Sequence, residues 1–93
     1  MKQWKFFPRG YSQEDWDRRM FPNYPNLKDV YEAMLQKSKH FRGMIEMRNE
    51  VKARHFTSTY NLKWELKQIK DKDTIHRIYI YDVGFFVQSD SAY

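Results

Sequence analysis

Residues 60–83 read YNLKWELKQIKDKDTIHRIYIYDV, and the prediction of the fold depends most on this stretch. Its first eight residues alternate apolar and polar side chains, which is the period of a half-buried β-strand. Residues 76–81 place two isoleucines on one side, and Arg77, Tyr79 and Tyr81 on the other. A charged turn separates the two halves. The stretch therefore predicts two antiparallel strands that share an apolar face.

The register of this hairpin depends on the length of its loop. A slip by one residue would turn charged side chains onto the core face. We therefore expect an odd-length loop with two apolar pairs, Leu66 with Ile78 and Trp64 with Ile80. Beyond it, a turn near Gly84 predicts a third strand over residues 85–88.

Two apolar stripes precede the hairpin. The first consists of Leu27, Val30, Tyr31, Met34 and Leu35, and with Asn26 as N-cap it predicts a helix over 27–40. The second consists of Met44, Met47, Val51 and His55 in a different helical phase. We therefore expect a break near residues 40–43 and a second helix over 44–55.

The N-terminal arm, residues 1–25, is rich in aromatic side chains. Trp4, Phe6 and Phe7 predict a short strand, followed by a helix over 13–20. Two prolines then make 21–26 an extended connector.

The length of 93 residues predicts one domain over 1–93. Its expected parts are the arm with its short helix (1–25), a helical pair (26–56) and an antiparallel sheet (57–90). The fold class is thus α+β, with a short N-terminal strand, two to three helices and a C-terminal antiparallel meander of two to three strands.

The composition excludes several classes of protein. The chain has no cysteine, which excludes a disulfide scaffold, a thiolate zinc site and a cysteine nucleophile. No apolar run reaches the length of a signal peptide or a membrane span, so we expect a cytoplasmic protein (of the host cell, if phage-encoded) with no membrane partner. Metal-ligand spacings and a glycine-rich phosphate loop are also missing, so we expect no metal and no cofactor.

No catalytic residue is predicted. His40, His55 and His76 are the groups that titrate near neutral pH. A histidine acts as a general acid or base only when a partner group lies at hydrogen-bond distance. The sequence places no such partner beside any of the three. A binding function is therefore favoured over an enzymatic one.

The net charge of +5 comes from the N-terminal two thirds of the chain. Residues 1–25 contain five basic and three acidic residues, and residues 26–56 contain seven basic and four acidic ones. A basic excess favours a polyanion or an acidic protein surface as partner, although a solvated helix face has the same composition. The candidate contacts to nucleic acid in this region are Lys37, Lys39, Arg42, Arg48, Lys52 and Arg54.

The predicted sheet adds an aromatic and basic face. Tyr79 and Tyr81 would stack unpaired bases, while Lys63, Lys67 and Arg77 would hold phosphates. Alternatively, the helices and the arm cover both faces and the tyrosines are part of the core. The leading hypothesis is a non-catalytic protein that binds nucleic acid or a nucleoprotein complex.

A second hypothesis is a phage-type accessory protein that inhibits a host or defence protein by direct binding. Small, cysteine-free, aromatic-rich chains without a catalytic constellation are common in that class. Aromatic anchors dominate such interfaces, and the candidates are Trp4, Trp16 and Tyr93.

A third hypothesis comes from a resemblance. The segments WELK (64–67) and HRIYIY (76–81), with Val83-Gly84, resemble the strand pair of RelE-type toxins. These toxins are small basic ribosome-dependent mRNA endonucleases with helices ahead of a sheet. The resemblance implies Lys67, Arg77 and Tyr81 as candidates for phosphate contact and proton transfer.

Overall fold

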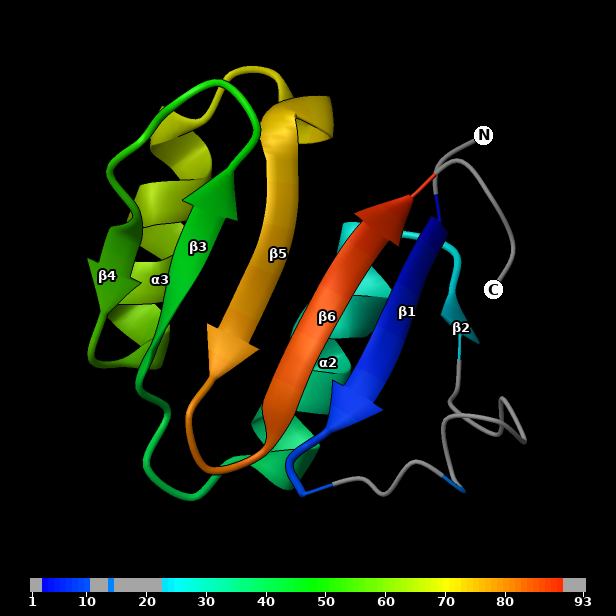
Figure 1. The fold of residues 1–93 in the computed structure, drawn as a ribbon. Coiled ribbons are helices and arrows are strands. Elements are labelled where there is room, and N and C mark those ends of the chain that lie inside the picture. The colour runs from blue at the N-terminus through cyan, green and yellow to red at the C-terminus, as the bar shows by residue number, and fades with distance from the viewer. Residues whose placement is uncertain (1–2, 11–13, 15–22, 90–93) are drawn as a thin grey trace.

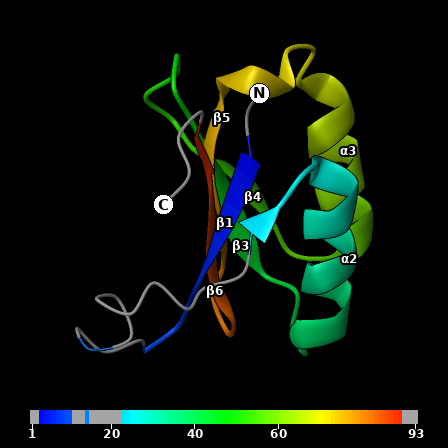
Figure 2. The ribbon, with the colours of Figure 1, turned by 90° about the vertical axis from the view of Figure 1, so that its right-hand side faces the viewer.

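The computed structural model describes residues 3–10, 14 and 23–89. Within them the chain forms an α+β fold, a six-stranded antiparallel sheet with two α-helices on one face (Figures 1 and 2). The strands lie in the order β2 (Asn23–Tyr24), β1 (Gln3–Pro8), β6 (Gly84–Ser89), β5 (Ile75–Ile80), β3 (Gly43–Met47) and β4 (Arg54–Phe56). The helices are α2 (Leu27–Lys37) and α3 (Thr59–Gln68), and a 3-10 turn, η1 (Lys72–Thr74), precedes β5.

Three predicted elements are confirmed. The N-terminal strand is β1, and the third strand of the meander is β6. The helix that starts at Leu27 is α2, and the Asn26 side chain caps it by accepting a hydrogen bond from the Asp29 N–H at 3.0 Å. This helix ends at Lys37 rather than at residue 40. The predicted helix over 13–20 lies outside the described residues, apart from Glu14.

The predicted first strand of the hairpin is wrong, because residues 60–67 belong to α3. The Ser58 side chain caps this helix by accepting a hydrogen bond from the Asn61 N–H at 3.1 Å. Leu62 and Leu66 fit a helical period as well as a strand period, and the helical one places both toward the core. Trp64, which only the strand period would bury, is 51% exposed.

The expected pairings of Ile78 and Ile80 with Leu66 and Trp64 are therefore also wrong. Ile78 lies between Ile45 and Phe86 in the sheet, and Ile80 lies between Gly43 and Gly84. The isoleucines are nevertheless on the core face, as predicted.

The predicted second helix over 44–55 is wrong as well, because this segment forms the β3–β4 hairpin. Burial alternates along β3, with Gly43, Ile45 and Met47 facing inward. Val51, which the helical stripe would have buried, is fully exposed in the turn. The two helices are thus separated by a hairpin, and the sheet extends over both ends of the chain rather than over 57–90 alone (Figure 1).

Figure 2 shows both helices on one face of the sheet. The main core consists of side chains from that face and from the two helices. Its most deeply buried side chains are Phe56, Phe86, Met34, Ile45, Leu62, Ile75, Ile78, Ile80 and Val30. Phe86 packs on Phe6 with 4.8 Å between ring centroids, which ties the N-terminal strand to the last one. Neither α2 nor α3 is long and apolar enough to cross a membrane.

The connection from α2 to β3 is fixed by the carboxylate of Asp82 in the β5–β6 turn. The Ser38 hydroxyl donates to Asp82 Oδ1 at 2.8 Å, and the N–H groups of Lys39 and His40 donate to Oδ2 at 2.8 and 3.3 Å. Burial by itself raises the pKa of Asp82, but these hydrogen bonds outweigh it and hold the pKa below its ordinary value.

This arrangement predicts a loss of stability in acid. Because the pKa of Asp82 is lower in the folded state, its contribution is present above the unfolded pKa of about 4 and is lost as the pH falls through the folded pKa. Asp82→Asn should lower the free energy of unfolding by about 1–2 kcal/mol at neutral pH. Urea titrations of both proteins should show this gap closing in acid, and a gap that stays constant to low pH would contradict the assignment.

Candidate nucleic-acid interface

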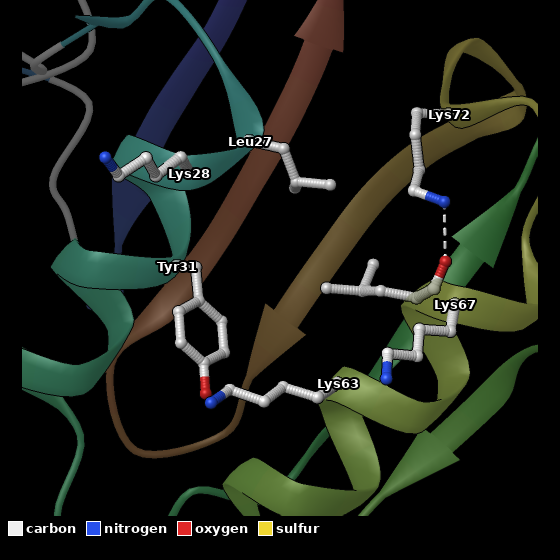
Figure 3. A pocket seen from close by; sticks show the side chains of 7 residues that line it. Leu27, Lys28, Tyr31, Lys63, Lys67 and Lys72 are labelled. Atoms are coloured by element: carbon white, nitrogen blue, oxygen red, sulfur yellow. Dashed lines mark hydrogen bonds between the residues drawn. The ribbon is translucent and has the colours of Figure 1, made fainter.

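A groove lies between the two helices (Figure 3). Its volume is about 380 Å³. We call it the lysine groove, lined by Leu27, Lys28, Tyr31, Lys63, Leu66, Lys67 and Lys72. Of these described lining residues, four are lysines and none is acidic. The groove therefore combines an apolar floor with a positive rim.

One lysine on the rim of the groove, Lys63, lies over an aromatic ring. Lys63 and Tyr31 point toward each other from the two facing helices (Figure 3), and Lys63 Nζ lies 5.6 Å from the Tyr31 ring centroid. A cation at this distance from a ring face is attracted to it. The ammonium group is thereby held over the groove.

Lys72 lines the groove and also caps the C-terminal end of α3. Its Nζ donates a hydrogen bond to the Leu66 carbonyl oxygen at 2.6 Å (Figure 3). It also donates to the carbonyl oxygen of Ile69. The last carbonyls of a helix have no partner within it, so this ammonium completes the C-terminal end of α3. The ammonium groups of Lys28 and Lys67, by contrast, form no hydrogen bond or ion pair within the described part of the chain. Their charges are available to a ligand.

Two exposed aromatic side chains lie next to the groove on α3. Tyr60 is 78% exposed and Trp64 is 51% exposed. Together with Lys63 and Lys67 they line a smaller hollow of about 140 Å³. Residues four apart are neighbours on a helix surface, so this exposed aromatic pair continues directly from the lysine groove.

The face of the sheet opposite the two helices (Figure 2) carries the second candidate surface. The rings of Tyr79 and Phe85 lie 5.5 Å apart, and those of Phe85 and Phe7 lie 5.2 Å apart. The guanidinium of Arg77 lies 5.5 Å from the Phe85 ring centroid. Phe7 is buried and Tyr79 is half-buried, so these rings stack on one another.

The polar groups of this face are also bonded to one another. Arg77 Nη1 donates to the Tyr79 hydroxyl at 3.2 Å, and that hydroxyl donates to Glu46 Oε2 at 3.4 Å. Glu46 Oε1 lies 2.9 Å from His76 Nδ1. The carboxylate thus offsets the nearby positive charge, which makes this face less suited to a phosphate backbone than the lysine groove.

Glu46 is a partner that sequence reasoning missed. It lies on β3, 30 residues before His76, in a segment whose spacing predicted a helix. Lys28 and Lys72 were missed for a related reason, because the groove exists only when residues 59–68 are helical. The one local signal for that helix is the Ser58 cap.

The basic residues predicted to contact nucleic acid do not form one surface. Arg54 lies 3.4 Å from both Glu50 and Glu65, and Arg48 donates to the Gln88 carbonyl oxygen. Lys37 Nζ lies 5.3 Å from the Phe6 ring centroid. Lys52 is exposed in the β3–β4 turn, whereas Lys39, Arg42 and Tyr81 lie near the β5–β6 turn. Of the predicted set, the lysine groove contains Lys63 and Lys67.

The structure also places the residues of the other two hypotheses. Trp4 is 2% exposed in the core, so it offers no surface to a partner protein, and Trp16 and Tyr93 lie outside the described residues. The strand pair that resembled RelE-type toxins is absent, because residues 64–67 are helical. Lys67 and Arg77 consequently lie on opposite sides of the sheet, and Tyr81 lies in a turn.

Comparisons with protein-family models, with curated proteins and with solved structures found no match. Within the residues that the structure describes, no group of three or more His, Cys, Asp or Glu side chains is placed to hold a metal ion.

Proposed function

We propose that this protein binds single-stranded nucleic acid in the lysine groove, with the exposed aromatic pair as a stacking surface. The observation that carries the proposal is the lining of the groove, four lysines around an apolar floor without an acidic residue among the described lining. Lysine ammonium groups neutralise phosphates, and aromatic side chains stack bases without regard to sequence. Binding of this kind needs no catalytic group.

The apolar parts of the surface favour a single strand over a duplex. A duplex presents mainly phosphates and groove edges, whereas unpaired bases expose their faces to Tyr, Trp and apolar side chains. Tyr60 and Trp64 are exposed and lie beside Lys63 and Lys67. Bases and phosphates of one strand therefore find partners on the same helix.

The proposal is tested by titrating single-stranded RNA, single-stranded DNA and duplex DNA at several salt concentrations. Single strands should bind most tightly, and three phosphate contacts, from Lys28, Lys63 and Lys67, predict a slope of log K against log salt of about −2. An absence of binding at low salt would overturn the proposal. The same groove would then be examined as a surface for an acidic partner protein, the inhibitor hypothesis.

Truncation of Trp64 tests the stacking part of the proposal. Trp64→Ala should weaken binding of a single strand about tenfold, because stacking on one aromatic side chain contributes about 1–3 kcal/mol. Leu35→Ala is a matched control, since Leu35 is 45% exposed on α2 and does not line the groove. Equal affinities of the two variants, measured by fluorescence anisotropy, would exclude Trp64 as a stacking residue.

A further inference from the structure

A second hollow, of about 350 Å³, lies where three distant segments meet at one end of the sheet. Its lining residues are Arg9, His40, Arg42, Tyr81 and Asp82. Arg9 follows β1, the next two belong to the α2–β3 connection, and the last two belong to the β5–β6 turn (Figure 1). None of these described lining residues is shared with the lysine groove, so this is a separate site, which we call the arginine pocket.

Backbone hydrogen bonds hold the three segments together. The Arg9 N–H donates to the Val83 carbonyl at 2.7 Å, and the Tyr81 N–H donates to the Arg42 carbonyl at 2.9 Å. The Asp82 carboxylate adds its three hydrogen bonds to residues 38–40. The positions from which the basic side chains project are therefore fixed before any ligand binds, which lowers the entropic cost of binding.

Phe41 explains why two basic neighbours project into the same pocket. Its ring is buried against Phe56, with 6.0 Å between centroids, while its backbone adopts a left-handed φ of 51°. Such a conformation is costly for a bulky residue and persists where its surroundings fix it. With Phe41 turned inward, His40 and Arg42 on either side are both exposed.

The charged side chains of the arginine pocket differ in how far they are already hydrogen-bonded within the protein. Arg9 Nη1 donates to the Tyr81 carbonyl at 3.3 Å, which orients its guanidinium. The side chains of His40 and Arg42 form no hydrogen bond or ion pair within the described part of the chain. Asp82 is the single acidic residue of the described lining, and its carboxylate already accepts three hydrogen bonds from residues 38–40.

We infer that the arginine pocket binds a phosphate group with two negative charges, as in a phosphomonoester. Two guanidinium groups offer forked donors that match the oxygens of a phosphate, and the Tyr81 hydroxyl is a further donor. The imidazole of His40 can add one more N–H donor. A free phosphomonoester and the terminal phosphate of a nucleic-acid strand share this chemistry, and the experiment separates them.

The first measurement is a titration of the isotope-labelled protein with inorganic phosphate, followed by amide chemical shifts. Saturable shifts should appear at residues 9, 40–42 and 81–82, with a dissociation constant of about 1 mM. Arg42→Gln should weaken this binding at least about fivefold, because a charge-assisted bidentate contact is lost. The Arg42 carbonyl that bonds Tyr81 is unchanged in this variant, so the fold should persist.

Lys52→Gln is the control, since it removes the same charge from an exposed turn elsewhere. The absence of saturable shifts, or equal phosphate affinity of the two variants, would overturn the inference.

The second measurement compares oligonucleotides with a 5′-phosphate and a 5′-hydroxyl. Tighter binding of the phosphorylated strand, lost in Arg42→Gln, would identify a strand end as the ligand. Equal binding with intact phosphate affinity would identify a free phosphomonoester. Phosphate binding does not depend on the lysine groove, so the two proposals fail independently.

Discussion

Gly43→Ala is expected to lower the free energy of unfolding by about 3 kcal/mol or more, the largest effect of any single methyl group that we predict. A Cβ atom at Gly43 would lie 1.7 Å from the Tyr79 carbonyl oxygen and 2.8 Å from Cζ of the Phe56 ring. The first neighbour is backbone of the adjacent strand and the second is buried. Neither moves without separating β3 from β5 or disturbing the core.

A loss of this size is a large part of the stability of a small domain, which is about 5–15 kcal/mol. Urea unfolding followed by circular dichroism measures it. Gly10→Ala is the matched control, because a Cβ there has nothing within 4 Å and meets only the cost of its φ of 76°. That cost is about 1–2 kcal/mol. Equal unfolding midpoints for the two variants would contradict the packing of β3 against β5.

Reversing two charges of the lysine groove should have the largest effect on binding. Lys63→Glu combined with Lys67→Glu removes two ammonium groups that the groove and the exposed aromatic pair share. It also places two carboxylates against the phosphates of the strand. We expect affinity for a single strand to fall about 100-fold, and the salt dependence to become shallower.

The control carries the same change in net charge at a different place. Lys52→Glu with Lys39→Glu alters exposed lysines that line neither the lysine groove nor the hollow beside the exposed aromatic pair. Its affinity for a 5′-hydroxyl strand should fall only severalfold, through the weaker overall field. If both double variants lose affinity equally, net charge rather than the groove governs binding. Circular dichroism should show intact helices in both.

Local cues explain which elements the sequence predicts correctly. The Asn26 cap directly precedes α2 and the apolar stripe lies within it, and the aromatic residues Trp4, Phe6 and Phe7 identify β1. At α3 the cues conflict, because Leu62 and Leu66 satisfy both periods. Only packing on the sheet, which brings in distant residues, decides between them.

The β3–β4 hairpin was missed because strand pairing is not local. β3 has five residues, and its burial is set by β5, which follows about 30 residues later. Prediction of the candidate site from the sequence is limited in the same way, because its residues come from distant segments. The alternating pattern predicts Lys63 and Lys67 as contacts, but on a strand, whereas their association with Lys28 and Tyr31 requires two helices on one face of the sheet.

The central claim is that a single strand of nucleic acid lies between α2 and α3. The most direct test follows the amide and side-chain chemical shifts of the labelled protein during titration with a 5′-hydroxyl oligonucleotide. We predict that the largest shifts fall on Lys28, Tyr31, Lys63, Trp64 and Lys67. Shifts concentrated instead on Arg77 and Tyr79, on the opposite face of the sheet, would contradict the claim.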